Sequence, residues 1–380
     1  ANGAKFKLID FAGGSNAKTL TEGNVSSNSA TLTFKAQSGD NAGGTLNSSA
    51  GTAGEDLWVL ASFAGTGNPD SGSSGEGGGS NPGANYSNAG NIGSGNPTAG
   101  AGNALSNIAN TTGGSGDMQT VVNTFNMYSA AQLNREVPKL APVSNSALTS
   151  QSMSTVNAGM NTVSARLDSL RGELRVAAGE TGLSAGDDER RSSVWLKGFG
   201  SKGEQDAKDS YNGYRTNTAG ASLGADTLVG VNDLRLGAAF SYAGTGVDQQ
   251  DQRTGDSTSI KSYQGTFYAM QEFGAAYLDG LLAYARHDYK SHRATAMGRT
   301  ASGVWNGRQI SARIDGGYRI PVGAMTLVPL ASLEWSKLKQ DAYTETGADS
   351  LSLNIDAATT TRLRSGLGGR LQTDMFVAGM

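Results

Sequence analysis

The stretch RQISARIDGGYRI, at residues 308–320, alternates between two kinds of side chain. One set of positions is apolar, aromatic or small, and consists of Ile310, Ala312, Ile314, Gly316, Tyr318 and Ile320. The other set is polar, and includes Ser311, Arg313, Asp315 and Arg319. A period of two predicts a β-strand, because successive side chains of a strand point to opposite faces of a sheet. The stretches DLRLGAAFSYAG at 233–244 and TRLRSGLGGRL at 361–371 divide in the same way.

Segments of this kind recur through the C-terminal half of the chain. We count eight, which begin near Val194, Tyr214, Asp233, Ser259, Ala275, Gly307, Thr326 and Leu353. They are longer than the strands of about five or six residues that are usual in soluble proteins. Short turns, such as GVND at 230–233 and PVGA at 321–324, alternate with the long polar connections 203–213, 245–259 and 290–303. Short turns on one rim and long loops on the other are typical of an antiparallel outer-membrane β-barrel.

The charged positions of these strands indicate which face meets lipid. A charge at the bilayer midplane costs about 2–4 kcal/mol, so the charged face must point into a wet lumen. The predicted lumen-facing residues are Lys197, Arg235, Asp279, Arg313, Asp315, Arg319, Glu334, Arg364 and Arg370. Aromatic residues lie toward the ends of the opposite, apolar faces, where an aromatic girdle is expected. They are Tyr242, Tyr284, Tyr318 and Trp335.

Residues 117–190 have a helical pattern. The spacing of apolar residues over 118–128 predicts one helix, which Pro138 and Pro142 end. A second helix is expected from Ser146 or Ala147 to about Ala177, with an apolar seam at Val156, Met160, Val163, Leu167, Leu170 and Leu174. A helix of about 20 residues spans about 30 Å, which is long enough to cross a membrane inside a polar lumen. Taken alone, the same heptad seam also fits an ordinary coiled coil.

The predicted lumenal helix carries charges that should meet charges on the strands. We expect Arg166, Asp168 or Arg171 to pair with strand residues. The candidate partners are Asp279, Arg313, Glu334 and Arg364.

The N-terminal third is rich in Gly, Ser, Asn and Thr. Residues 1–64 contain three short β-like stretches, AKFKLIDFA at 4–12, ATLTFKA at 30–36 and EDLWVLASFA at 55–64. Residues 65–116 have too few apolar side chains to bury, and we interpret them as a flexible tether. The predicted organisation is therefore a β-rich segment at 1–64, a tether at 65–116, a helical linker at 117–190 and an incomplete barrel at 191–380.

The composition argues against several classes of function. The net charge of -3 offers no basic face for nucleic acid. The chain has no cysteine, hence no disulfide, thiolate zinc site or cysteine nucleophile, and its only histidines are His287 and His292. No apolar run approaches the length of about 20 residues that a membrane helix needs. We therefore predict no catalytic residue, no cofactor, no metal site and no nucleic-acid partner.

Two weak catalytic patterns have ordinary explanations. The sequence GDST at 255–258 has a faint likeness to an esterase nucleophile motif, but we interpret it as a polar loop. His287 stands beside Asp288, and we interpret it as a residue of the rim or the lumen.

Several stretches, in their order along residues 117–380, resemble the translocator β-domain of the monomeric, type V autotransporters of Gram-negative bacteria. The stretches are SAAQLNREV at 129–137, VSARLDSLRGE at 163–173, VWLKGFGSKGEQ at 194–205, YLDGLLAYARHDYKSHR at 277–293, LVPLASLEWSKLKQDAYTETGA at 327–348 and SLNIDAATTTRLRSGLGGRL at 352–371. The resemblance implies a barrel of about twelve strands whose lumen holds the preceding helix. It also implies a monomer in the outer membrane that delivers an N-terminal passenger to the cell surface. The implied partners are outer-membrane lipid, the barrel-insertion machinery, periplasmic chaperones and the chain's own passenger.

The sequence departs from that family at its C-terminal end. It stops at DMFVAGM, 374–380, after eight strands and the start of a ninth, whereas the family ends in a strand with a terminal aromatic residue. About four strands are missing by comparison, so we expect a truncated domain that does not close a barrel around its helix unaided. A passive porin, a surface adhesin anchored by the barrel, a trimeric coiled-coil protein and a soluble β-sandwich are the alternatives to a translocator.

Overall fold

The computed structural model describes residues 5–9, 23–25, 32–39, 56–63, 86, 97–111, 116–143, 145–171, 182–185, 192–208, 212–230, 234–323 and 325–373. These residues fall into two compact units. The first contains the described residues up to Pro142, together with Thr295–Arg299 and Ala348–Leu351. The second contains all the others, and each unit is described by itself below.

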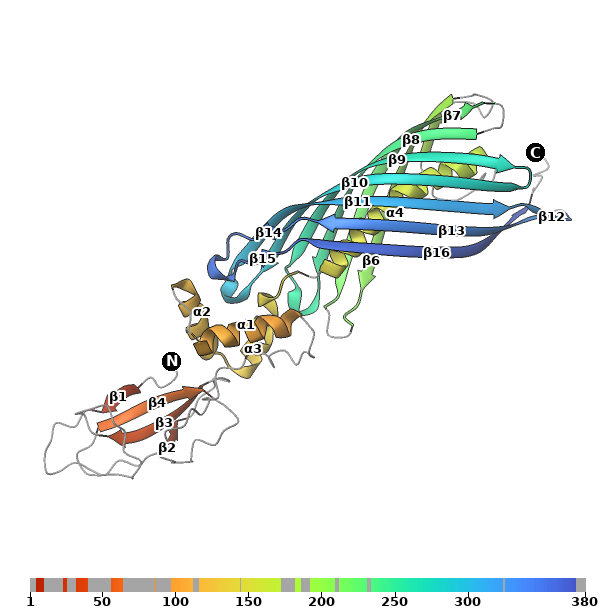
Figure 1. Cartoon of the computed structure of the whole chain (residues 1–380). Coiled ribbons are helices and arrows are strands. Elements are labelled where there is room, and N and C mark those ends of the chain that lie inside the picture. The colour runs from red at the N-terminus through yellow and green to blue at the C-terminus, as the bar shows by residue number, and fades with distance from the viewer. Residues whose placement is uncertain are drawn as a thin grey trace, which may run out of the picture. The chain divides into compact units, whose positions relative to one another are not determined.

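The second unit is an antiparallel sheet that curls around a helix (Figure 1). Each long strand pairs with the next long strand along the chain. The eight long strands are β6 (Ser192–Gln205), β7 (Tyr214–Val229), β8 (Leu234–Gln249), β9 (Ser257–Phe273), β10 (Ala276–Ala294), β11 (Thr300–Tyr318), β13 (Met325–Gln340) and β16 (Ala358–Thr373). The prediction of eight long antiparallel strands is confirmed.

Two of the predicted strand starts are wrong. In both cases the difference lies in the residues that precede the apolar part of the strand. β11 begins at Thr300 instead of near Gly307, because its pairing with β10 continues to the pair Ala294–Thr300 through polar residues. The last strand begins at Ala358 instead of near Leu353. The intervening connection contains the one-turn helix η4 (Asp349–Leu351) and the short paired strands β14 (Tyr343–Thr344) and β15 (Asn354–Ile355).

The sheet is open among the described residues. β16 pairs only with β13, while β6 pairs with β7 and with the short strand β5 (Gly182–Ala185). β12 (Ile320–Val322) folds back on the start of β13. The need for further strands to close a barrel around the helix stays a prediction.

Helix α4 (Asn145–Leu170) lies along the concave face of this sheet (Figure 1). Its start agrees with the predicted start at Ser146 or Ala147. The predicted positions Leu174 and Ala177 lie outside the described residues. The prediction of a helical linker as far as residue 190 is wrong at Gly182–Ala185, because β5 pairs there with β6.

The first unit contains helices α1 (Pro97–Thr111), α2 (Asp117–Asn126) and α3 (Ala130–Glu136), followed by the short helix η1 (Pro138–Leu140). The prediction of a tether is wrong over α1. Its sequence is mostly Ala, Asn and Gly, but Leu105 is buried in a core that distant residues supply. Tyr86 belongs to that core, is fully buried, and donates from its backbone N–H to the Ser106 Oγ over 2.8 Å.

The predicted helix after residue 117 divides in two. Ser129 interrupts it with a capping box, in which the Ser129 N–H donates to the Gln132 Oε1 over 2.9 Å and the Gln132 N–H donates back to the Ser129 Oγ. Serine at this position satisfies the free backbone donors of a new helix start. The apolar spacing runs through this break because both helices bury their apolar residues in one core. That core includes Val121, Val122, Phe125, Leu133, Val137 and Leu140.

The N-terminal strands β1 (Lys5–Ile9), β2 (Gly23–Val25), β3 (Leu32–Gly39) and β4 (Asp56–Phe63) form an antiparallel sheet in the order β1-β4-β3-β2. Three of them coincide with the three β-like stretches of the sequence. Two further one-turn helices, η2 (Asp251–Arg253) and η3 (Ala296–Gly298), lie in the connections β8–β9 and β10–β11. None of the helices in the described part of the chain is long and apolar enough to cross a membrane.

Candidate functional site

The apolar seam of α4 packs on the concave face of the sheet. Val156, Met160, Val163 and Leu167 are each at most 1% exposed. Leu170 is partly buried against the same cluster, and Leu174 lies outside the described residues. On the sheet side the cluster consists of Trp195, Ala239, Tyr268, Met270, Leu281, Ala283 and Ala285. The seam therefore places the helix on the sheet by apolar contact.

A second, polar seam of α4 faces the sheet through hydroxyl groups. The Ser152 Oγ and the Tyr289 hydroxyl share a hydrogen bond of 2.7 Å, and the Thr155 and Thr245 hydroxyls share one of 3.1 Å. The Thr162 hydroxyl donates to the Ser222 Oγ over 2.8 Å. This seam was missed from the sequence, because Ser and Thr on a helix are usually solvated. Their spacing of three and seven residues is the signal that could have revealed it.

At one position of the helix, a side chain would meet the end of a buried side chain of the sheet. A Cβ atom at Gly159 would lie 2.5 Å from the Gln264 Oε1. A glycine in the middle of a helix weakens it, so its presence here is explained by the close approach.

The first charged cluster centres on Asp226 of β7. Its carboxylate accepts from the Arg166 Nε over 3.1 Å, the Arg235 Nη1 over 2.7 Å, the Ser193 Oγ over 2.8 Å and the Tyr268 hydroxyl over 3.2 Å. The Asp226 side chain is completely buried. Arg235, which was predicted to face the lumen, pairs here with Asp226, and Arg166 pairs with the same carboxylate, which was not among its expected partners. One buried carboxylate thus joins the helix to strands β6, β7, β8 and β9.

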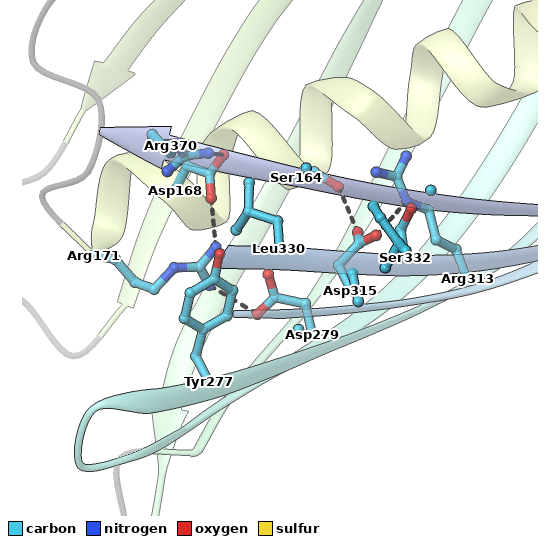
Figure 2. A pocket seen from close by; sticks show the side chains of 15 residues that line it. Ser164, Asp168, Arg171, Tyr277, Asp279, Arg313, Asp315, Leu330, Ser332 and Arg370 are labelled. Atoms are coloured by element: carbon cyan, nitrogen blue, oxygen red, sulfur yellow. Dashed lines mark hydrogen bonds and ion pairs between the residues drawn. The ribbon is translucent and has the colours of Figure 1, made fainter. Parts of the chain in front are cut away.

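The second charged cluster lies at the C-terminal end of α4 and is formed by Asp168, Arg171, Asp279 and Arg370 (Figure 2). Arg171 donates to Asp279 over 2.8 Å and to Asp168 over 2.5 Å, and its guanidinium lies 4.0 Å from the centre of the Tyr277 ring. Arg370 of β16 donates to Asp168 over 2.9 Å. The expected pairing of Arg171 with Asp279 is present.

Arg313 and Asp315 of β11 form the third cluster. The Arg313 Nε donates to Asp315 over 2.8 Å, and its Nη1 donates to the Asn161 Oδ1 of the helix over 2.6 Å. The Ser164 hydroxyl donates to Asp315 over 3.4 Å. A cavity of about 270 Å³ lies between this cluster and the second one, and Figure 2 shows the two clusters around it. Charged side chains of both clusters line it, together with Leu330, Ala331 and Leu367.

Arg319 and Glu334, which were also predicted to face the lumen, pair with charged residues of other strands. Arg319 donates to Glu272 over 3.1 Å, and Glu334 accepts from Arg362 over 3.1 Å. Arg364 lies opposite Glu334 in the register of β13 and β16 and is exposed. Lys197 is half-buried, two residues from the buried Trp195 on the same face of β6.

The opposite face of the sheet is apolar and exposed. The predicted girdle residues Tyr242, Tyr284, Tyr318 and Trp335 are 38–53% exposed. Between them lie exposed Leu, Ile, Val and Phe side chains, such as Phe267 and Ile314. An apolar outer face and a charged, paired inner face are what a sheet needs in order to be surrounded by lipid.

Two kinds of site that the sequence analysis considered, a metal site and a histidine dyad, can be compared with the described residues. No group of three His, Asp or Glu residues among them could hold a metal ion. His287 is buried and bonded to the Ser262 Oγ over 2.8 Å and the Gln309 Oε1 over 3.3 Å, so an amide stands where a catalytic histidine would have a carboxylate. Asp288 points to the other face and accepts from Arg286 over 3.0 Å.

Residues 194–380 match the family model of the autotransporter β-domain. Outer membrane protein A of Rickettsia conorii is 25% identical over 202 residues, and outer membrane protein B of Rickettsia typhi is 29% identical over 196 residues. These matches cover 50% and 48% of this chain but only 10% and 12% of the relatives, so the chain spans about a tenth of their length. The solved translocator domain of autotransporter NalP from Neisseria meningitidis is 20% identical, with a TM-score of 0.44. That match covers 57% of this chain and 71% of the NalP chain.

Proposed function

We propose that this chain, which belongs through residues 194–380 to the autotransporter β-domain family, is a translocator that carries its own N-terminal segment to the cell surface. The curled sheet lies in the outer membrane of a Gram-negative bacterium, and α4 occupies its lumen. The predicted lumen-facing residues then line the wall around that helix.

The observation that carries the proposal is the contact of α4 with the whole sheet. Hydrogen bonds or ion pairs link the helix and Arg171 to seven of the long strands, and the apolar seam packs on the eighth, β9, at Tyr268. A helix that carries Arg166 and Asp168 would place charged side chains in lipid if it lay on the outer side of the sheet, which is costly. The helix therefore belongs to the interior.

The direction of α4 supports the orientation of the exported segment. The start of the helix packs near the ends of β8 and β10 that lead into long connections, where Val247 and Tyr289 lie. Its C-terminal end pairs with Asp279, close to the short turn before β10. Long loops lie outside the cell and short turns face the periplasm in outer-membrane barrels. The chain that precedes α4 thus emerges at the cell surface.

A passive porin fits this interior less well than a translocator. A porin needs a continuous aqueous path, whereas here the charges of the helix are paired with the wall and its apolar seam is buried on the sheet. An adhesin anchored by the same barrel remains compatible, because the ligand of the N-terminal segment would be recognised outside the barrel.

We also propose the partners that such a barrel requires. They are outer-membrane lipid, the machinery that inserts barrels, periplasmic chaperones and the exported segment itself. We propose that the barrel acts as a monomer and has no catalytic role, with the buried pairs Arg166–Asp226 and Arg171–Asp279 serving to hold the helix to the wall.

The test of this function is labelling of single cysteines on intact cells. Residues 1–380 contain no cysteine, so each introduced thiol is unique among them. Lys208 is exposed in the β6–β7 loop and Val322 is 57% exposed beside a short turn. In the protein expressed from its own gene with an N-terminal epitope tag, we expect a membrane-impermeant maleimide to label Lys208→Cys on intact cells, and Val322→Cys only after permeabilisation. The tag should be accessible to antibody on intact cells. Labelling of Val322→Cys alone, or a hidden tag, would reject the proposal.

A further inference from the structure

Within the first unit, the carboxylate of Asp117 receives donors from two loops that are far apart in sequence. The Arg299 Nη1 and Nη2 donate to its two oxygens over 2.6 and 2.7 Å. The Ser350 N–H and hydroxyl donate to the same carboxylate over 3.2 and 2.5 Å. Arg299 ends the β10–β11 loop, and Ser350 lies in η4 of the β13–β16 connection. Bidentate guanidinium–carboxylate pairs are among the stronger polar contacts in proteins.

The two loops are also held to each other. The Arg299 Nη1 donates to the Ala348 carbonyl over 3.4 Å and lies 3.8 Å from Asp349. Each loop contains a non-glycine residue in the left-handed region, Met297 with φ 61° and Asp349 with φ 51°. Such conformations persist where surrounding contacts hold them, so the arrangement around Asp117 is specific.

Asp117 is the first residue of α2, and α2 belongs to a helical group with its own core. Phe125 of α2 is fully buried and makes an edge contact with the Tyr86 ring, at 6.1 Å between ring centres. Leu133 and Val137 are also buried in that core. A contact that holds α2 therefore holds the whole group of helices at 97–140.

We propose that Asp117, Arg299 and Ser350 form a latch that fastens this helical group to the two loops after export. The proposal rests on the proposed function, which assigns the long loops to the cell surface. A helix is about 10–12 Å across and packed helices lie about 8–10 Å apart, so the folded group is wider than the space that one lumenal helix fills. Once folded and latched, it prevents the exported chain from sliding back.

The ionisation of the latch suits a surface exposed to changing pH. Arg299 first, and then Ser350, hold the pKa of Asp117 well below its usual range. The charged groups that face Asp117 are Arg299 and, beyond it, Asp349. Because folding lowers the pKa of this carboxyl, the stability that the ionised Asp117 gives to the latch is fully present above the ordinary carboxyl pKa. It is lost only as the pH falls through the lowered value. The latch is thus closed at neutral and mildly acidic pH.

Amide hydrogen exchange on the protein purified from outer membranes in detergent tests the latch. In Asp117→Asn, we expect exchange to become severalfold faster in three segments together: α2, the loop 295–299 and the segment 348–351. Asp349→Asn is the matched control. The Asp349 carboxylate also lies near Arg299, but at the longer distance of 3.8 Å, and its side chain is 74% exposed. This substitution should leave the three segments unchanged. Faster exchange confined to α2 would contradict the proposal, because a carboxylate acting only on its own helix end would affect α2 alone.

Two further readouts separate a failed latch from a failed fold or a failed function. Ser350→Ala removes only the neutral hydroxyl donor, so it should speed exchange in the same three segments by a smaller factor. No change in either variant with an intact, heat-modifiable barrel would overturn the latch. The N-terminal tag of Asp117→Asn should still be accessible on cells. A tag hidden in the unaltered protein would reject the proposed function, whereas the exchange result decides the latch.

Discussion

Replacing Asp226 by asparagine is expected to lower the free energy of unfolding of the barrel by about 3–5 kcal/mol, the range measured when one partner of a buried ion pair is removed. Asp226 is the acceptor for both Arg166 and Arg235, and its side chain is fully buried. Without its charge, two guanidinium groups of the interior lose their counter-ion. We also expect α4 to lose protection from hydrogen exchange, because Arg166 is its link to this cluster.

Urea unfolding of the protein purified from outer membranes measures this effect, with Asp288→Asn as the control. Asp288 also forms a carboxylate–arginine pair, with Arg286, but the two side chains are 40% and 60% exposed. Exposed pairs contribute about 0–1 kcal/mol, so the control should shift the midpoint little. Equal effects of the two substitutions would show that the Asp226 cluster is not buried in the assembled barrel.

Deleting residues 145–170 is expected to raise the single-channel conductance in planar bilayers severalfold. The deleted helix is about 10–12 Å across and is hydrogen-bonded to the wall from Ser152 to Arg166. Its removal leaves an aqueous path lined by the charged inner face of the strands. The unaltered protein should conduct weakly, since its interior is filled.

The deletion variant must keep the mobility shift between unboiled and boiled samples that marks a folded barrel. A folded variant whose conductance equals that of the unaltered protein would mean that this segment does not fill the lumen.

Double substitution of Ser152 and Thr155 by alanine is a smaller change to the same helix. It removes two helix–wall hydrogen bonds and should leave the helix in place, because the apolar seam remains.

The strands and the seam of α4 could be predicted because their patterns are periodic. Alternation over long segments is explained by a strand whose two faces meet different surroundings. Each of the long strands could be predicted from this alternation. The seam at Val156, Met160 and Val163 is equally periodic, and these residues are buried on the sheet. The pair Arg171–Asp279 was among the expected pairs, since both charges lie on faces that exclude lipid.

Other features depend on contacts that local sequence does not reveal. Asp226 lies in a segment of small residues, and its importance arises only when Arg166 and Arg235 meet it. Helix α1 has the composition of a tether, yet Leu105 is buried in the unit that also buries Tyr86 and Phe125. The break at Ser129 does not disturb the apolar spacing, so periodicity alone joined two helices into one.

The central claim, that α4 lies inside the barrel of the exported protein, is tested most directly by a disulfide between the helix and the inner wall. The Thr155 and Thr245 hydroxyls are 3.1 Å apart, and residues 1–380 contain no cysteine. In intact cells that display the N-terminal tag, Thr155→Cys with Thr245→Cys should form a cross-link. Thr155→Cys with Tyr242→Cys, on the outer face of the same strand, should not. Absence of the first cross-link, or equal cross-linking of both pairs, would contradict the account.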